Sequence, residues 1–321
     1  MLINIVALLG GLVVLVYSAD CFVDGAVSIA KNFGVSPLLI GLTIVGLGTS
    51  APEILVSAIA SLQGNTGLAI GNALGSNIAN IGLILGATAL IMPLSFHSQL
   101  LKRELPILIF TSILCYALAF DGLGQIDAFI MLTGLGVFLC WLVWSAKNNK
   151  TRDPLSEEIE QELPELLSIN KAWMFFALGL VGLLLSSKLL VWAAVNIAIH
   201  YGVSDLVIGL TIVAFGTSLP ELAASITSVM KKEDDLAVGN VIGSNMFNLL
   251  AVYSLPGLLS PGSVGETVLS RDFPVMLVFT IGLFVLGYGI PKSETINRRE
   301  GGVLLLGYLA YQWMVFQTAV T

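Results

Sequence analysis

Charged residues are scarce in this chain. Lys, Arg, Asp and Glu make up 11% of its 321 residues, whereas soluble domains carry about 25%. Hydrophobic residues reach 56%, and apolar runs of roughly 20 residues, the length that a membrane-spanning helix requires, recur along the sequence. The shortage of charge excludes an ordinary soluble domain and predicts an all-α polytopic membrane protein.

Cysteine, histidine and positive charge are also limited. The three cysteines, Cys21, Cys115 and Cys140, form neither a metal-binding spacing nor a disulfide framework. The two histidines, His97 and His200, fall in expected loops and predict no function there. A net charge of −7 gives no support for nucleic-acid binding. We therefore expect no cofactor and no nucleic-acid partner.

The apolar runs predict ten transmembrane helices. Short connections rich in turn-forming residues separate most of them, and only residues 147–170, an acidic stretch, are long enough to link two halves. The ten expected spans are approximately 2–30, 36–61, 67–92, 104–120, 125–146, 171–199, 204–229, 236–260, 272–290 and 301–319.

Basic residues gather on one side of these expected spans. Of the 14 Lys and Arg residues, twelve fall in loops on that side, Arg271 alone falls on the other, and Lys188 lies within a span. The positive-inside rule then places both termini outside and the 147–170 linker in the cytoplasm. We accordingly expect a multi-pass protein of the cell's inner (plasma) membrane.

A repeat relates the two halves of the chain. Residues 41–80 reappear without a gap as residues 209–248, with 19 of the 40 positions identical. Each expected half has five helices, an odd number, so the second copy must insert upside down. The prediction is a first inverted repeat over 1–146, with its repeat region at about 36–92, and a second over 171–321, with its region at about 204–260. Inverted repeats with interrupted hydrophobic segments indicate a binding site near the bilayer midplane.

The motif Gly-Thr-Ser-x-Pro-Glu occurs once in each copy, ending at Glu53 and at Glu221. Pro52 and Pro220 each remove a hydrogen-bond donor and clash with the carbonyl four residues earlier, which predicts that helices 2 and 7 are broken. Non-helical backbone at this depth is tolerated only inside protein or beside water. The carbonyls of residues 46–49 and 214–217 are therefore expected to face a cavity.

The two glutamates are expensive to place in a membrane. Each costs roughly 2.5–3.5 kcal/mol at a helix centre, and neither repeat core, the apolar span around the glutamate, contains a basic residue to offset the charge. Protons or metal cations are the available partners. A protonated structural carboxyl is the alternative, and the duplication of the motif disfavours it.

The polar side chains around the glutamates all carry oxygen. Such a ligand set suits hard cations, Ca²⁺ and Na⁺, and not soft transition metals. For the asparagines at 72, 77, 240 and 245, a structural role in bonding nearby backbone is an equal alternative. The full set is Thr49, Ser50, Asn72, Ser76, Asn77 and Asn80, with Thr217, Ser218, Asn240, Ser244, Asn245 and Asn248 in the second copy.

Both forty-residue copies resemble the alpha-repeats of the sodium/calcium exchangers, within the calcium/cation antiporter superfamily, and the short linker resembles that of a compact prokaryotic member. The resemblance implies a secondary antiporter that exchanges Ca²⁺ for Na⁺ by alternating access, with the first and sixth helices sliding past a core. Some relatives have aspartate at one position that matches Asn80 or Asn248, whereas this chain has asparagine at both. The implied central site is Glu53, Glu221, Ser50, Ser218, Asn80 and Asn248, and the implied sodium sites are lined by Thr49, Thr217, Ser76 and Ser244 with the carbonyls of Gly46 and Ala214.

Other functions remain open at this point. Ca²⁺/H⁺ or K⁺-dependent exchange would use the same carboxylates, and a cation channel would also fit the repeat. An intramembrane enzyme with Ser50 or Ser218 as nucleophile would need a His or Lys beside the serine, and none is placed there to activate it. Asp20 and Lys188 hold equivalent positions and are candidates for gating. The acidic run at 157–165 predicts a solvated linker more than a calcium sensor. Membrane lipid is the remaining expected partner, and the oligomeric state is not determined.

Overall fold

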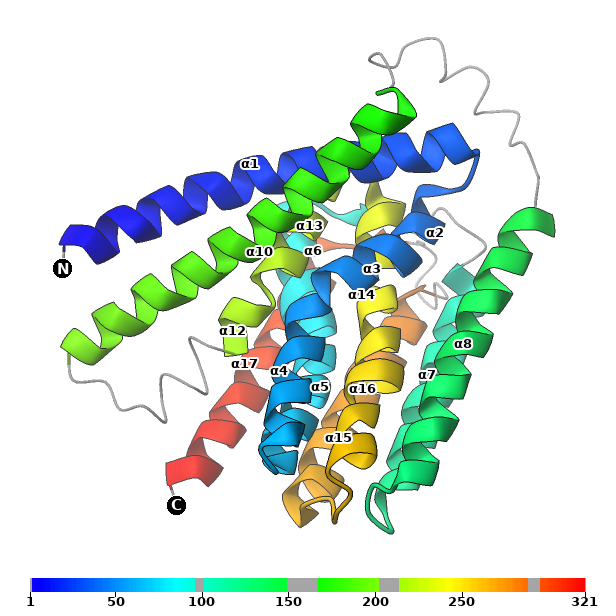
Figure 1. Ribbon diagram of the computed structural model, residues 1–321, viewed down its shortest axis with the longest axis vertical. Coiled ribbons are helices and arrows are strands. Elements are labelled where there is room, and N and C mark those ends of the chain that lie inside the picture. The colour runs from blue at the N-terminus through cyan, green and yellow to red at the C-terminus, as the bar shows by residue number, and fades with distance from the viewer. Residues whose placement is uncertain (1, 96–100, 149–166, 202–213, 288–294, 321) are drawn as a thin grey trace.

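The computed structural model describes residues 2–95, 101–148, 167–201, 214–287 and 295–320. These residues form helices apart from their connections and one short antiparallel strand pair, β1 (Leu94–Ser95) with β2 (Thr295–Ile296). Most of the helices run lengthwise beside one another, and two long ones cross them obliquely (Figure 1).

A helical segment falls within each of the ten predicted ranges, although residues 204–213 of the seventh range lie outside the described residues. Among the described residues, six helices are long and apolar enough to cross a membrane, or up to seven if one bent pair counts as a span. The segments are α1 (Leu2–Phe33), α2 (Pro37–Ile40), η1 (Gly41–Val45), α3 (Gly46–Thr49), α4 (Ala51–Leu62), α5 (Thr66–Ala79), η2 (Asn80–Leu85), α6 (Gly86–Ile91), α7 (Leu101–Ala119), α8 (Gln125–Asn148), α10 (Ile169–His200), α12 (Ala214–Thr217), α13 (Leu219–Met230), α14 (Asp234–Phe247), η4 (Asn248–Val252), α15 (Ser254–Leu259), η5 (Val268–Asp272), α16 (Phe273–Gly287) and α17 (Arg298–Val320).

Two continuous spans form the centre of the bundle. Each of these spans contains an apolar stretch of 18 residues. The buried share of that stretch is 72% in Thr66–Ile91 and 94% in Asp234–Leu259, whereas it is 17% in α1. These two spans carry Asn72, Ser76, Asn77 and Asn80 and the equivalent residues of the second copy, so these polar positions lie where protein surrounds them. The remaining helices shield this centre.

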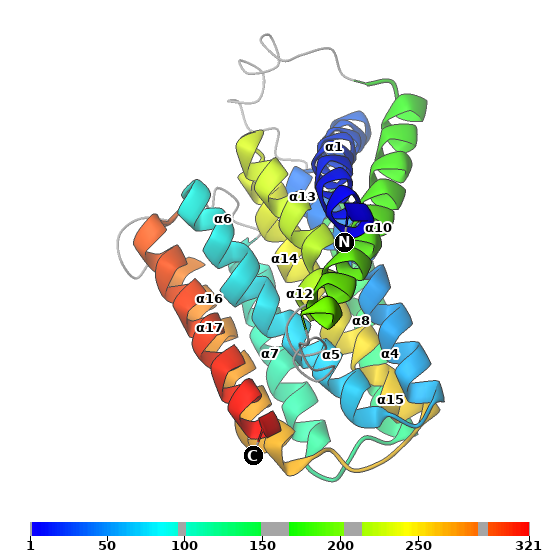
Figure 2. The same ribbon diagram turned by 90° about the vertical axis from the view of Figure 1, so that its left-hand side faces the viewer.

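The oblique pair, α1 and α10, lie side by side along their length (Figures 1 and 2). Glycines allow this close approach. A Cβ added to Gly25 would lie 2.3 Å from the backbone nitrogen of Phe176, and one added to Gly179 would lie 2.4 Å from that of Phe22. Small residues at a helix interface let two backbones approach in this way in membrane proteins. The phenylalanine rings themselves lie 4.8 Å apart.

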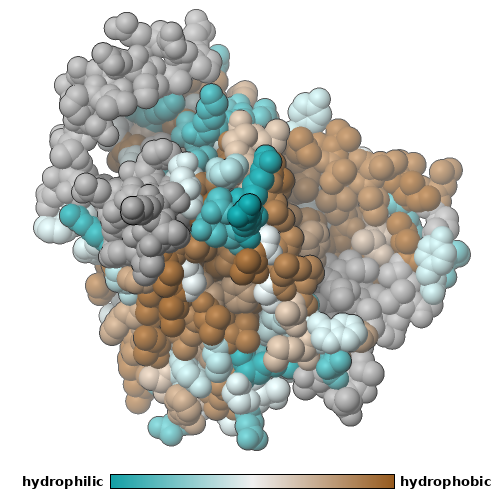
Figure 3. Space-filling model, turned by 180° about the vertical axis from the view of Figure 1, so that it is seen from behind, coloured by the Kyte–Doolittle hydropathy of each residue, from teal (hydrophilic) through white to brown (hydrophobic). Residues whose placement is uncertain are grey.

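The surface is apolar where a bilayer would contact it. Large hydrophobic side chains such as Leu9, Phe129 and Leu306 are more than half exposed, which is costly in water. Seen from behind, hydrophobic residues fill the middle of the molecule, while hydrophilic residues gather toward its upper and lower ends (Figure 3). The architecture is that of an all-helical, polytopic membrane protein.

Candidate cation site

Both Gly-Thr-Ser-x-Pro-Glu motifs break a helix, and the break falls at the serine. Ser50 has φ −79° and ψ 3°, and Ser218 has φ −88° and ψ 3°, outside the helical region. In the first copy the segments Leu38–Thr49 and Ala51–Leu62 meet at 44°. The predicted breaks at Pro52 and Pro220 are thus present, with each proline in the first turn of the helix that follows, where its missing N–H costs nothing.

The serine and glutamate of each motif have the spacing of a capping box, Ser-x-x-Glu, which the sequence analysis overlooked. In such a box the serine hydroxyl bonds the backbone of the glutamate, and the carboxylate bonds back. Neither Ser50 nor Ser218 makes a capping hydrogen bond, and Ser50 Oγ has no partner among the described residues. The hydroxyl oxygen of Ser50 is therefore available to another ligand.

Glu53 and Glu221 lie together inside the protein. Each is 1% exposed, and the two carboxyl groups are close enough for their charges to interact. Oε2 of each glutamate has no hydrogen-bond partner within the described part of the chain. Both occupy the first turn of a helix, α4 or α13, where the helix dipole favours negative charge.

Each glutamate-bearing helix packs against the opposite copy of the repeat. Helix α4 contacts η4, which begins at Asn248, and α13 contacts η2, which begins at Asn80. Both asparagines are 1% exposed. The π-helical turns at these two positions were not predicted, because no sequence pattern marks them. Such turns are frequent at functional sites.

The oxygens of one predicted sodium site lie within hydrogen-bonding distance of each other. Thr49 Oγ1 is 3.1 Å from Asn240 Oδ1 and 3.3 Å from Ser244 Oγ, and Ser244 Oγ is 3.4 Å from the carbonyl oxygen of Gly46. The Thr49 hydroxyl also interacts with the carboxyl group of Glu221. Thr49, Gly46 and Ser244 are thus brought together from the two copies.

The residues of the other predicted sodium site come from α12 and α5. Helix α12, which contains Ala214 and Thr217, contacts α5, which carries Ser76. Ser76 is buried. The carbonyl of Gly216, freed by Pro220, accepts a hydrogen bond of 2.7 Å from Ser187 of α10. Sequence reasoning missed Ser187, because nothing near that residue resembles the motif.

Asn72 and Asn240 turn out to bond backbone, as the structural alternative predicted. Asn72 Nδ2 donates to the carbonyl of Glu53 at 3.0 Å and to Ser57 Oγ at 2.9 Å. Asn240 Nδ2 does the same to Glu221 at 3.4 Å and to Ser225 at 3.2 Å. In each copy the amide therefore ties the turn that carries the glutamate to the next helix.

Asp20 and Lys188 have different surroundings despite their equivalent positions. Lys231, just after α13, bonds both Asp20 at 2.7 Å and Asp24 at 2.6 Å. Burial disfavours the charge of Lys231, but the hydrogen bonds and charges of the two aspartates outweigh it and raise its pKa. Lys188 is exposed, as is His200. His97 and the acidic run at 157–165 lie outside the described residues.

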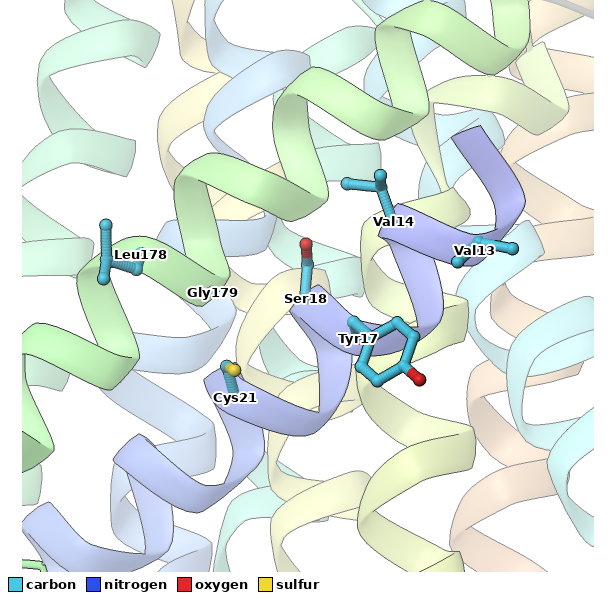
Figure 4. A pocket seen from close by; sticks show the side chains of 7 residues that line it. All are labelled: Val13, Val14, Tyr17, Ser18, Cys21, Leu178 and Gly179. Atoms are coloured by element: carbon cyan, nitrogen blue, oxygen red, sulfur yellow. The ribbon is translucent and has the colours of Figure 1, made fainter. Parts of the chain in front are cut away.

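A cavity of about 220 Å³ opens between α1 and α10. Its lining is mostly apolar, and Figure 4 shows no carboxylate among the labelled side chains. It contains neither glutamate of the motif and is separate from the candidate site. The lining residues are Val13, Val14, Tyr17, Ser18, Cys21, Leu178 and Gly179.

The donor set at the glutamates fits a hard cation. Two carboxylates match the charge of one divalent ion, and the surrounding hydroxyl, amide and carbonyl oxygens are the ligands that Ca²⁺ and Na⁺ prefer. Among the residues that the structure covers, no group of three or more His, Cys, Asp or Glu side chains is arranged so that it could hold a metal ion. The geometry is that of a membrane protein with a pair of buried, interacting carboxyl groups.

Comparison with known proteins agrees with this class. The family model described as sodium/calcium exchanger protein matches residues 3–147 and 171–317. The putative antiporter CaxA of Alkalimonas amylolytica is 48% identical over 99% of this chain and all of its own length, and the inner membrane protein YrbG of Escherichia coli K12 is 39% identical over 98% of each. The solved structure of the sodium-calcium exchanger NCX_Mj aligns with a TM-score of 0.82 and 32% identity, covering 97% of each chain. The chain belongs to the sodium/calcium exchanger family.

Proposed function

We propose that this protein is a secondary antiporter that exchanges Ca²⁺ for Na⁺ across the inner (plasma) membrane by alternating access. One observation carries the proposal. Two buried glutamates, one from each copy of the repeat, interact with each other and have carboxylate oxygens with no partner among the described residues. Such a pair is neutralised by one divalent cation or by monovalent cations that replace it. Membership of a family of transporters supports this function over an enzyme.

The central site consists of the two glutamates with the oxygens of Ser50, Ser218, Asn80 and Asn248. Two observations support this assignment: Ser50 and Ser218 make no capping hydrogen bond, and α4 contacts η4 while α13 contacts η2. The flanking sodium sites consist of Thr49, Ser244 and the Gly46 carbonyl on one side, and of Thr217, Ser76 and the Ala214 carbonyl on the other.

The chain spans the membrane ten times as two inverted five-helix repeats, 1–146 and 171–321. The equivalent helix breaks at Ser50 and Ser218 and the swapped contacts between copies support this topology. Both termini are outside and the linker 147–170 is cytoplasmic, as the distribution of Lys and Arg predicts. A cysteine introduced into the linker should react with a membrane-impermeant thiol reagent added outside the cells only after the membrane is permeabilised.

Transport in vesicles tests the proposal. Purified protein is reconstituted into vesicles loaded with Na⁺ and diluted into Na⁺-free buffer that contains labelled Ca²⁺. We expect uptake that depends on the Na⁺ gradient and stops when a sodium ionophore dissipates it. Parallel vesicles with a pH gradient or a K⁺ gradient separate the alternative couplings. Uptake driven by the pH gradient alone would replace Na⁺ with H⁺ in the proposal.

A further inference from the structure

Asn80 and Asn245 come from different copies of the repeat and pair inside the protein. Asn80 Nδ2 donates to Asn245 Oδ1 at 2.9 Å, and both residues are 1% exposed. A side-chain amide has an oxygen that can bind a cation and a nitrogen that can only donate hydrogen bonds. When the nitrogen of Asn80 is held by Asn245, the oxygen is the end left for a ligand.

The equivalent pair in the other copy is not formed. Helix α5, which carries Asn77, contacts η4 and Asn248, just as α14 with Asn245 contacts η2 and Asn80. Asn77 Nδ2 instead donates to Met276 Sδ at 3.7 Å. Oδ1 of Asn77 and both polar side-chain atoms of Asn248 have no partner among the described residues. The Asn77 oxygen and the Asn248 nitrogen correspond to the acceptor and the donor of the formed pair. Both atoms are buried, on two segments that contact each other.

One departure from the repeat accounts for this difference. The position equivalent to Met276 in the first half is Leu108, 168 residues earlier. A leucine has no acceptor atom, whereas the thioether of a methionine is a weak one. Leu108 therefore cannot hold an amide nitrogen as Met276 holds that of Asn77.

We propose that Asn245 is a positioning residue for cation binding, and that Asn77 has the same role for Asn248. By accepting a hydrogen bond from the amide nitrogen, each directs the oxygen of its partner asparagine toward the cation. In the described state Met276 holds the amide nitrogen of Asn77, and the oxygen of Asn77 accepts no hydrogen bond from Asn248. Asn80 is therefore oriented by a partner asparagine, and Asn248 is not. The inference rests on the proposed function, in which Asn80 and Asn248 bind the cation.

Substitutions at Asn245 separate orientation from packing. Asn245→Asp keeps an acceptor oxygen at the same place, whereas Asn245→Leu has a similar size and no acceptor. In Na⁺-driven Ca²⁺ uptake we expect Asn245→Leu to raise the KM for Ca²⁺ by about 10- to 100-fold, the usual effect of losing a residue that orients a metal ligand. Asn245→Asp should keep a KM close to that of the wild type, and kcat should change little in both.

Met276→Leu tests the other half in the opposite direction. This swap conserves volume and is usually tolerated, so it also serves if Asn245→Leu does not fold. It releases Asn77 to accept from Asn248, and we expect the KM for Ca²⁺ to fall by about fivefold, the value of one hydrogen bond. A merely structural role of Met276 would not produce a gain of affinity.

Three outcomes would overturn the inference: an unchanged KM in Asn245→Leu, equal increases in the Leu and Asp variants, or a KM in Met276→Leu that does not fall. Failure of the proposed function is a separate result, because wild-type protein would then show no Na⁺-driven uptake at all. Melting temperatures of the purified variants, measured beside the wild type, identify any loss of folded protein.

Discussion

The two copies of the repeat share 19 of 40 residues, yet the same residues have different neighbours in the structure. Asn80 bonds the amide of Asn245, while the equivalent Asn248 has no partner among the described residues. The flanking helices differ as well. Helix α10 bonds the freed carbonyl of Gly216 through Ser187, but the equivalent residue of α1 is Ala19, which has no side-chain donor.

This comparison shows what an inverted repeat can and cannot make symmetric. Identical motifs give both copies the same break and the same buried glutamate. The surroundings of those motifs come from residues outside the forty, which have diverged. A protein that opens a midplane site alternately to two sides needs two halves that exchange arrangements, and unequal contacts decide which arrangement is more stable.

The largest expected effect tests the part that is symmetric. Glu53→Gln and Glu221→Gln should each reduce Na⁺-driven Ca²⁺ uptake to background, because one remaining carboxylate under-neutralises a divalent ion. Glu104→Gln is the matched control, since Glu104 is also 1% exposed but lies outside the candidate site. If only one of the two glutamate variants lost transport, the assignment of both glutamates to one shared site would be wrong.

The next effect concerns a close contact of the second copy with the first. A Cβ on Gly243 of α14 would lie 2.6 Å from the carbonyl oxygen of Leu42 in η1. Gly243→Ala should therefore destabilise the protein by about 1–3 kcal/mol, seen as a lower melting temperature in detergent. Gly136→Ala on α8, where no described atom lies within 4 Å of the added carbon, should leave the melting temperature unchanged or slightly higher.

A smaller effect is expected from the asymmetric hydrogen bond of α10. Ser187→Ala leaves the buried carbonyl of Gly216 without this donor, which costs about 1–3 kcal/mol at most. We expect an altered KM for Na⁺ with little change in the KM for Ca²⁺, measured in the same vesicles. Ala19→Ser, at the equivalent position of α1, is the mirror variant. Identical Na⁺ and Ca²⁺ responses to Ser187→Ala would contradict a local role beside the sodium site.

The smallest effect concerns the ion pairs of α1. Lys231 bonds Asp20 and Asp24, whose side chains are about half exposed at 55% and 45%, and such pairs contribute about 0.2–1 kcal/mol each. Lys231→Ala should change the transport rate by a few-fold and reduce its dependence on salt. Lys188→Ala, at the exposed lysine of α10, should leave both unchanged. If Lys231→Ala and Lys188→Ala changed the transport rate and its salt dependence equally, the effect would not come from the ion pairs of Lys231 with α1.

Much of the fold followed from the sequence. Helices lie in all ten predicted ranges, with ends within a few residues wherever the structure describes them, because apolar length and turn-forming residues are local signals. The helix breaks at the two prolines were also predicted, because proline acts on its own turn. The π-helical turns at Asn80 and Asn248 were not, since they depend on how neighbouring helices pack.

The roles of the asparagines show where sequence reasoning stopped. All six lie in matching positions of the two copies, and spacing alone did not separate ligands from structural groups. The structure shows that Asn72 and Asn240 bond the backbone beside the glutamates. The carboxylate pair was predictable for the opposite reason: a charge in an apolar span is unusual wherever it packs.

The sequence by itself determined the class of protein, the duplication and the two acidic residues, because composition and motifs are properties of the chain. Only the tertiary structure decided that Thr49 meets Asn240 and Ser244, that Asn80 pairs with Asn245, and that Asn77 does not pair with Asn248. Those contacts join residues more than 160 positions apart. Their geometry depends on which glycines let helices approach and on single side chains such as Met276, and no local pattern encodes that.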